Sequence, residues 1–315
     1  MRPTLLMVPA LPGPLVARLA EEYDVLGPVA DCTPGGLPPG HERTRALLTF
    51  GGYRTDGALM DAMPRLGLIN TYGTGYEGVD LAAARARGIV VANGGDTNAQ
   101  SVAEHAMGLL LAGGRLILHG DRFVRAGQWT SNAVDRFPSV PGLAGRRIGI
   151  YGLGAIGRRV AAVAEAFAMT VGYHGRAARP EVGYAYHPTL VGLARWADVL
   201  LVAVRAGPEN RHAVDAAVLE ALGTDGFLVN VSRGSVVDEA ALCDALERNT
   251  LAGAGLDVFQ NEPGVSPRLL ALDRVVMTPH IAAKTGLAQR AQQDLMLDNV
   301  RAFFAGKPVR SIVVA

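Results

Sequence analysis

Residues 146–159, RRIGIYGLGAIGRR, decide the fold that we predict for this chain. Ile148–Tyr151 form a short apolar run of the kind that makes a buried parallel strand. The run breaks into the glycine-rich segment Gly152–Gly157 and resumes as an apolar-periodic helix over Val160–Phe167. A strand, a glycine-rich turn and a helix in this order are typical of a dinucleotide-binding site. An ordinary turn is the alternative, because glycine accounts for 39 of the 315 residues.

Each glycine of this turn has a separate physical role. Gly152 permits the tight turn from strand to helix, Gly154 lets the backbone approach a pyrophosphate, and Gly157 lets the helix pack close to the strand. The helix begins at Ala155 and Ile156, where unpaired N–H groups and the positive end of the helix dipole favour phosphates. We therefore expect a dinucleotide cofactor at this turn.

Length and composition exclude several classes of protein. A chain of 315 residues with 49% hydrophobic and 19% charged residues is expected to fold into two domains. A net charge of +1 gives no electrostatic reason to expect nucleic acid or an anionic membrane as a partner. The two cysteines, Cys32 and Cys243, lack the spacing of metal ligands, so we expect no metal site and no disulfide framework. Reduced thiols fit a cytoplasmic protein.

The apolar N-terminal stretch is not expected to be a signal peptide. Pro3, Pro9, Pro12 and Pro14 interrupt any continuous helix there, and a strand over Leu5–Val8 fits the pattern better. No uninterrupted apolar run reaches the length that spans a membrane.

Short apolar runs alternate with helical patterns along the chain, which predicts parallel sheets covered by helices. Strands are expected at residues 5–8, 46–50, 66–70, 89–92, 171–173, 199–204, 227–231, 255–258 and 275–278. Helices are expected at residues 15–23, 57–63, 81–87, 215–222 and 239–247. The proline-containing segments 31–39 and 137–142 are predicted to be loops.

Two longer helical patterns, over Ser101–Gly127 and Leu287–Phe304, flank the second run of strands. The predicted fold is therefore α/β, with two Rossmann-like or flavodoxin-like parallel-sheet domains. The dinucleotide-binding domain, residues 99–286, would be inserted into a substrate domain of residues 1–98 and 287–315, and the cleft between them is the expected ligand site.

Three polar residues follow predicted strands of the second domain: Arg233, Glu262 and His280. Ligands bind beyond the carboxyl ends of strands in an open parallel sheet, so a cation, a carboxylate and an imidazole can converge there. Each has a structural alternative when taken alone. Arg233 would cap a helix, Glu262 would be a solvated loop carboxylate, and His280 would be a packed core histidine.

Several motifs in a fixed order resemble the D-isomer-specific 2-hydroxyacid dehydrogenases. They are the glycine turn, VSRGSVVDEAAL at residues 231–242, GLDVFQNEP at residues 255–263 and TPHIA at residues 278–282. Residues 71–111, from TYGTGYEGVD to SVAEHAMGLLL, are similar to the substrate loop and first inter-domain helix of that family. The resemblance extends from Asn70 to the C-terminus.

The resemblance implies the reduction of a 2-oxo acid, by a hydride to the carbonyl carbon and a proton to its oxygen. His280 would donate the proton, and Glu262 would hold the other ring nitrogen so that the acid stays available near neutrality. Arg233 would bind the substrate carboxylate through two hydrogen bonds and polarise the carbonyl.

Other positions match the family's binding residues. The backbone N–H groups of Gly73, Thr74 and Gly75 would hold the substrate carboxylate in an anion nest. Asp257 would bind the nicotinamide carboxamide, and Val231 would lie beside the cofactor.

The tip of the second strand indicates which nicotinamide cofactor binds. It reads His174-Gly175-Arg176 and lacks the acidic residue that bonds the ribose hydroxyls in NAD-preferring sites. Gly175 followed by Arg176 favours a 2′-phosphate, and His174 would assist. The alternative is that Arg176 and Arg179 are solvated loop charges. We predict a preference for NADPH and leave NADH open.

Glyoxylate or hydroxypyruvate is the expected substrate, and a larger phenylpyruvate-type 2-oxo acid is the first alternative. A non-catalytic dinucleotide sensor resembling the C-terminal-binding corepressors is the second. Lys284 and Arg205 depart from the family pattern, and sequence does not place them. We expect a homodimer formed through the cofactor domain. Five histidines show no partner pattern and are interpreted as structural: His41, His105, His119, His187 and His212.

Overall fold

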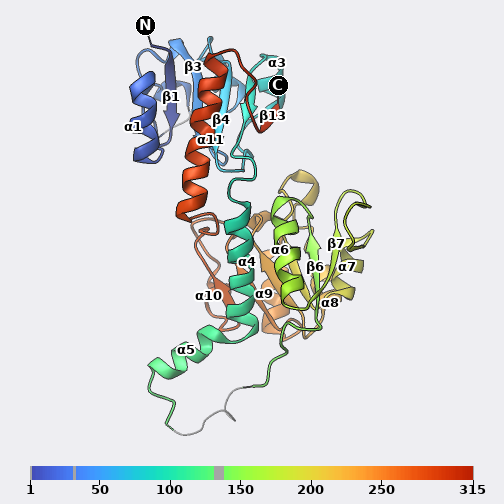
Figure 1. Ribbon diagram of the computed structural model, residues 1–315. Helices are drawn as coiled ribbons and strands as arrows, with labels where there is room; N and C mark the ends of the chain where they lie inside the picture. The colour runs from blue at the N-terminus through green and yellow to red at the C-terminus, as the bar shows by residue number, and fades with distance from the viewer. Residues whose placement is uncertain (1, 31–32, 131–137, 315) are drawn as a thin grey trace. The chain divides into compact units, whose positions relative to one another are not determined.

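Parallel strands that alternate with helices make up both halves of the computed structural model, which describes residues 2–30, 33–130 and 138–314 (Figure 1). The chain divides into unit 1, Met1–Asn98 with Thr285–Ala315, and unit 2, Ala99–Lys284. The chain passes from unit 1 into unit 2 and returns, so unit 2 is an insertion. The two helix-covered sheets confirm the predicted α/β fold class.

Unit 1 contains one six-stranded sheet. Its strands are β1 (Thr4–Val8), β2 (Asp24–Leu26), β3 (Thr44–Phe50), β4 (Leu68–Tyr72), β5 (Val90–Ala92) and β13 (Ile312–Val314). Their order is β13-β5-β4-β3-β1-β2, with only β13 antiparallel among the described strands. The order 2-1-3-4-5 is that of flavodoxin-like folds.

Helices cover both faces of the unit 1 sheet. They are α1 (Gly13–Glu22), α2 (Gly57–Asp61), α3 (Leu81–Ala86) and α11 (Gly286–Phe304). Successive residues of a strand point to opposite faces. Leu6 and Val8 of β1 accordingly pack with residues of α2 and α3, whereas Leu5 and Met7 pack with residues of α1 and α11.

Unit 2 contains one seven-stranded parallel sheet. Its strands are β6 (Arg147–Tyr151), β7 (Thr170–His174), β8 (Ala185–Tyr186), β9 (Val199–Val202), β10 (Phe227–Asn230), β11 (Gly253–Leu256) and β12 (Val275–Met277). The order β8-β7-β6-β9-β10-β11-β12 begins with the 3-2-1-4-5-6 arrangement of the Rossmann fold. The order reverses between β6 and β9, where such folds bind dinucleotides.

Seven described helices belong to unit 2. They are α4 (Ala99–Gly114), α5 (Ile117–Arg125), α6 (Ala155–Ala166), α7 (Leu190–Trp196), α8 (Ala216–Leu222), α9 (Glu239–Glu247) and α10 (Pro267–Leu270). Val199 and Leu201 of β9 pack with α4 and α6, whereas Leu200 and Val202 pack with α7, α8 and α9. Each such buried aliphatic side chain contributes about 1.5–3 kcal/mol of hydrophobic free energy.

The helix predicted without interruption over Ser101–Gly127 is wrong, because it breaks at Arg115–Leu116. Leu116 adopts a left-handed backbone with φ of 54°, and α5 continues at 59° to α4. Gly113 and Gly114 precede the break, and two glycines in a row weaken the helical backbone. In the described part of the chain no single helix meets the requirements of a membrane span, and α4 and α5 meet them only together across this bend.

Most differences in element boundaries amount to one or two residues at the end of a strand or helix. β9 ends at Val202 instead of Val204, and β4 runs over Leu68–Tyr72 instead of residues 66–70. The predicted loop over residues 31–39 contains a 3-10 turn at Pro34–Gly36. Asp31, Cys32 and Phe137, which the two loop predictions included, lie outside the described residues.

Candidate active site

The predicted cation, carboxylate and imidazole lie on loops at one edge of the unit 2 sheet. β10, β11 and β12 are neighbouring parallel strands, so their carboxyl ends meet at the same edge. Arg233 follows β10, Glu262 follows β11, and His280 follows β12. The fold therefore gathers these three residues although up to 47 positions separate them in sequence, counted from Arg233 to His280.

His280 and Glu262 form a hydrogen-bonded pair. His280 Nδ1 lies 2.7 Å from Glu262 Oε2, and the other carboxylate oxygen accepts a hydrogen bond of 3.0 Å from the Phe259 N–H. Burial disfavours the charged carboxylate, but the hydrogen bonds from His280 and Phe259, with the charges of His280 and Arg233, outweigh burial and lower the pKa of Glu262. The carboxylate is thus ionised at neutral pH and fixes one nitrogen of the ring.

Arg233 belongs to a turn pressed against the segment that carries Glu262. A Cβ on Gly234 would lie 1.8 Å from the Phe259 carbonyl carbon, so only glycine fits after Arg233. The buried Asn230 side chain donates to the Arg233 carbonyl at 3.1 Å and fixes the turn. Arg233 Nη1 donates to the Ser232 carbonyl at 2.8 Å. Its positive charge is a minor contribution to the lowered pKa of Glu262.

Asp257 follows β11 and is almost completely buried, with 1% of its surface exposed. Its Oδ1 accepts hydrogen bonds from the Thr278 hydroxyl at 2.7 Å and the Ile281 N–H at 2.9 Å, and its Oδ2 accepts one from the Ala282 N–H at 2.9 Å. The carboxylate therefore ties down the loop on both sides of His280.

The glycine turn has the close approaches that its sequence predicts. Gly152 has φ of 100°, and a Cβ there would lie 2.6 Å from the backbone of Val204 after β9. A Cβ on Gly157 would lie 2.3 Å from the Gly152 carbonyl oxygen, whereas Gly154 has no atom within 4 Å of that position. Ala155 and Ile156 open α6, whose first backbone N–H groups have no partner within the helix. This open helix end fits a pyrophosphate.

The tip of β7 presents His174, Gly175 and Arg176. His174 is half-buried, and its Nδ1 lies 2.8 Å from the His187 carbonyl oxygen, so its Nδ1 is already engaged. Arg176 is exposed. Val231 is buried directly after β10, where its N–H donates to the Val202 carbonyl across the sheet.

In unit 1, Gly73–Gly75 form a turn directly after β4, with φ of 86° at Gly73. All three carbonyl oxygens are occupied: Gly73 accepts from the Gly94 N–H at 2.6 Å, Thr74 from Asn93 Nδ2 at 2.8 Å, and Gly75 from Thr71 Oγ1 at 2.9 Å. None of the three N–H groups donates a hydrogen bond within the described chain. Such a turn offers donors without acceptors, as an anion site requires.

The model of the D-isomer specific 2-hydroxyacid dehydrogenase NAD binding domain matches residues 107–282, more than half of the chain. The chain belongs to this family. Among its relatives are the 2-ketogluconate reductase of Gluconobacter oxydans strain 621H, 42% identical over 86% of both chains, and the hydroxyphenylpyruvate reductase of Plectranthus scutellarioides, 38% identical over 87% of this chain and 86% of the relative.

Among solved structures, the chain is similar to the NADPH-dependent glyoxylate/hydroxypyruvate reductase of Sinorhizobium meliloti in complex with NADP and malonate. The TM-score is 0.92 at 39% identity, over 99% of this chain and 97% of that one. This D-isomer specific 2-hydroxyacid dehydrogenase is thus an NAD(P)-dependent 2-oxo acid reductase whose NAD-binding domain is inserted in its substrate domain. The alternative of a non-catalytic dinucleotide sensor is therefore not retained.

His105 is a residue of this dehydrogenase that sequence reasoning interpreted as merely structural. It lies on α4, and its Nε2 is 2.8 Å from Thr278 Oγ1 and 3.4 Å from Asp257 Oδ1. The partners are 173 and 152 positions away, so no local pattern could reveal them. Lys284 is exposed two residues beyond Ala282, and its N–H donates to the Ile281 carbonyl.

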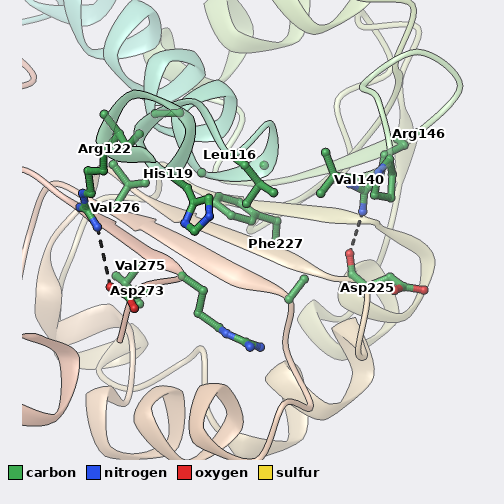
Figure 2. A pocket seen from close by; sticks show the side chains of 17 residues that line it. Leu116, His119, Arg122, Val140, Arg146, Asp225, Phe227, Asp273, Val275 and Val276 are labelled. Atoms are coloured by element: carbon green, nitrogen blue, oxygen red, sulfur yellow. Dashed lines mark hydrogen bonds and ion pairs between the residues drawn. The ribbon is translucent and has the colours of Figure 1, made fainter. Parts of the chain in front are cut away.

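A cavity in unit 2 of the dehydrogenase lies away from these residues. Figure 2 shows it lined by His119 and Arg122 of α5, by Arg146 before β6, and by Phe227 and Val275. Phe227 and Val275 are the first residues of β10 and β12. The cavity thus lies at the amino-terminal edge of the sheet, opposite the edge that carries His280, and is distinct from the candidate active site.

Proposed function

We propose that this chain reduces a small 2-oxo acid, glyoxylate or hydroxypyruvate, to the D-2-hydroxy acid with NADPH. The observation that carries the proposal is the His280–Glu262 pair at the carboxyl edge of a Rossmann sheet, with the Arg233 charge beside it. Unit 2 is proposed as the dinucleotide-binding domain and unit 1 as the substrate domain.

Each group in the site has a proposed role in the reduction. The reduced nicotinamide, when bound, supplies the hydride. Glu262 holds His280 Nδ1, which leaves Nε2 as the ring nitrogen that donates a proton to the carbonyl oxygen. Arg233 can pair with a carboxylate through two parallel hydrogen bonds and keep the reacting carbonyl oriented.

Further binding roles are proposed for two groups of unpaired N–H donors, for Asp257 as an acceptor and for Val231. The N–H groups of Gly73, Thr74 and Gly75 form an anion site suited to a carboxylate. The α6 N-terminus after Gly154 is suited to the pyrophosphate. Asp257 Oδ2 accepts one hydrogen bond, so it keeps a lone pair for the carboxamide of the nicotinamide. Val231 is proposed to contact the cofactor as well.

The NADPH preference is supported by the β7 tip. A carboxylate at this tip would repel a 2′-phosphate, and the chain has Gly175 and the exposed Arg176 instead. His174 is proposed to assist through its second ring nitrogen. The Sinorhizobium meliloti reductase, described as NADPH-dependent, is similar over the whole length of the chain.

A small substrate is supported by the packing of the substrate loops in unit 1. The loops after β3 and β4 press together so closely that a Cβ on Gly51 would lie 2.1 Å from the Gly75 carbonyl carbon. A larger 2-oxo acid is the second candidate, because relatives of comparable identity are named as reductases of 2-ketogluconate and hydroxyphenylpyruvate.

The test is the loss of reduced-nicotinamide absorbance with glyoxylate, hydroxypyruvate, 2-ketogluconate and phenylpyruvate, each with NADPH and NADH. The expected result is the highest kcat/KM with NADPH and one of the two small acids. His280→Ala should lower kcat by about 10²–10⁴-fold and leave the Kd of NADPH within about twofold. Fastest turnover with 2-ketogluconate or phenylpyruvate would move the substrate assignment to the second candidate.

We also propose a cytoplasmic homodimer that associates through unit 2. Cys243 is buried and unpaired, which fits a reducing compartment. Figure 1 shows α5 projecting from the body of unit 2, and Ile117 and Val124 on this helix are 53% and 52% exposed. Exposed apolar side chains on a projecting helix support association with a second copy.

A further inference from the structure

The backbone of His280 is strained, and neighbouring groups hold it in place. Its φ of 53° lies in the left-handed region, which is unfavourable for a non-glycine residue. The His280 N–H donates to the Asp257 carbonyl at 2.9 Å, and the next two N–H groups, of Ile281 and Ala282, donate to the Asp257 carboxylate. Asp257 therefore holds the turn that orients the His280 ring.

The Asp257 carboxylate is itself held by a chain of two further side chains. The Thr278 hydroxyl donates its only proton to Asp257 Oδ1, at 2.7 Å, so it can only accept a hydrogen bond from His105. His105 Nε2 is therefore the donor in the 2.8 Å contact with that hydroxyl. Both hydrogen bonds therefore have a fixed direction: His105 donates to Thr278, and Thr278 donates to Asp257.

From this chain of contacts we propose that His105 is a positioning residue for proton transfer, acting through Thr278 and Asp257 on the turn that carries His280. The inference rests on the proposed function, because it takes His280 as the proton donor. His105 comes from α4, near the start of unit 2, whereas Thr278 and His280 lie near its end. The contact between His105 and Thr278 therefore joins α4, the first helix of unit 2, to the loop after β12, near the end of unit 2.

Because the hydrogen bonds of His105, Thr278 and Asp257 are largely buried, the loss of the His105 donor is expected to change the position of His280. Asp257 is 1% exposed and the His105 side chain 23%, so water reaches Asp257 poorly and cannot replace a missing donor there. Without His105 the Thr278 hydroxyl oxygen loses its donor, and the hydrogen bond from Thr278 to Asp257 loses the cooperative strengthening that this donor provides. The carboxylate is then held less firmly, and the strained turn gains alternative conformations. Glu262 bonds the ring Nδ1 of His280, whereas Asp257 bonds the backbone of the turn.

The test compares His105→Leu, which removes the donor at similar volume, with His105→Gln, which restores an N–H donor. We expect His105→Leu to lower kcat about tenfold, the loss that one hydrogen bond produces, with the KM of the 2-oxo acid and the Kd of NADPH changed less than about twofold. His105→Gln should recover most of kcat. Glu104→Gln, the exposed neighbour on α4, is the matched control and should leave kcat unchanged.

A double-mutant cycle with Thr278→Val shows whether the two residues act along one path. Removing His105 and Thr278 together should cost no more than removing one, because both changes break the same chain. Additive losses, or a kcat of His105→Leu within twofold of the parent, would overturn the proposal. So would a kcat of His105→Gln as low as that of His105→Leu.

A second measurement keeps the test independent of turnover. In protein labelled with 15N-histidine, the ring resonances of His280, assigned with His280→Gln, should be sharp in the parent and His105→Gln and broadened in His105→Leu. Unchanged His280 resonances in His105→Leu would refute the inference even if no 2-oxo acid is reduced. A parent that reduces none of the acids would instead overturn the proposed function.

Discussion

Glu262 illustrates how two opposing effects decide the charge of one residue. Burial raises the energy of its carboxylate, and the donors His280 and Phe259 lower it more, so its pKa is below the usual carboxyl range. A group whose pKa is lowered on folding stabilises the fold above its unfolded pKa, about 4.3, and this contribution is lost as the pH falls through the folded value.

Glu262→Gln should therefore destabilise the protein at neutral pH and progressively less below about pH 4. We expect a Tm difference from the parent of only about 1–3 °C at pH 7, because the carboxylate is one-third exposed and solvent screens the pair. Thermal unfolding at a series of pH values checks this, with Glu104→Gln as the surface control. A Tm difference that stays constant from pH 7 to pH 3 would contradict it.

Arg176 should decide the choice between the two nicotinamide cofactors. Arg176→Ala is expected to weaken NADPH binding about 10–100-fold, the range for hydrogen bonds to a charged group, and to leave NADH almost unchanged. Fluorescence titration of both cofactors measures the ratio of the two Kd values. Arg179→Ala is the matched control, since Arg179 lies 3.9 Å from Glu181 at the same loop. An unchanged ratio in Arg176→Ala would remove the basis for the NADPH preference.

Single residues were predictable from sequence where a short motif carries them. Arg233, Glu262 and His280 stand in recognisable runs, whereas their hydrogen bonds depend on loop geometry that the runs do not contain. His105 shows the limit, because it lies on an apolar-periodic helix and its partner is 173 positions away. The role of a partly buried polar side chain of this kind can be inferred only when its contacts are known.

At the scale of elements, the glycine turn makes a prediction that separates packing from binding. Gly154→Ala places a Cβ where no atom lies within 4 Å, at φ of −87°, so the Tm without cofactor should change by less than about 1 °C. The same methyl group stands where the backbone approaches the pyrophosphate, so the Kd of NADPH should rise at least about tenfold.

Gly157→Ala provides the contrast within the same helix. Its Cβ would lie 2.3 Å from the Gly152 carbonyl oxygen, so the fold itself should lose about 1–3 kcal/mol. Thermal unfolding without cofactor distinguishes the two variants. Equal Tm losses in Gly154→Ala and Gly157→Ala would show that both glycines serve packing alone.

Elements were predictable where a long periodic pattern meets a clear boundary signal. The glycine turn between β6 and α6 has both, and the structure follows the prediction closely. The short edge strands β2 and β8 have three and two residues, too few for a period to show. The apolar spacing continues through the break at Leu116 and does not indicate it. The left-handed Leu116, which follows Gly113, Gly114 and Arg115, turns the backbone there.

At the scale of the whole molecule, the inserted topology was predictable because two strand-helix series and a final long helix follow one another in the sequence. Sheet order was not readable directly, since the switch between β6 and β9 depends on which strands pair. The proposed homodimer also belongs to this scale, and it rests on the exposed apolar side chains Ile117 and Val124 of α5.

The two faces of α5 suggest how to test the homodimer. His119 and Arg122 line the cavity of Figure 2, whereas Ile117 and Val124, seven positions apart, share the opposite face and are more than half exposed.

Ile117→Asp combined with Val124→Asp should convert a dimer into a monomer, because each buried carboxylate would cost several kcal/mol at an apolar interface. Leu270→Asp, at a residue 63% exposed on α10, is the control and should stay dimeric. Light scattering after size exclusion at about 10 µM reports the mass, in a range where typical homodimers stay associated. A parent that is monomeric there would refute the homodimer, and a double variant that remains dimeric would place the interface elsewhere on the chain.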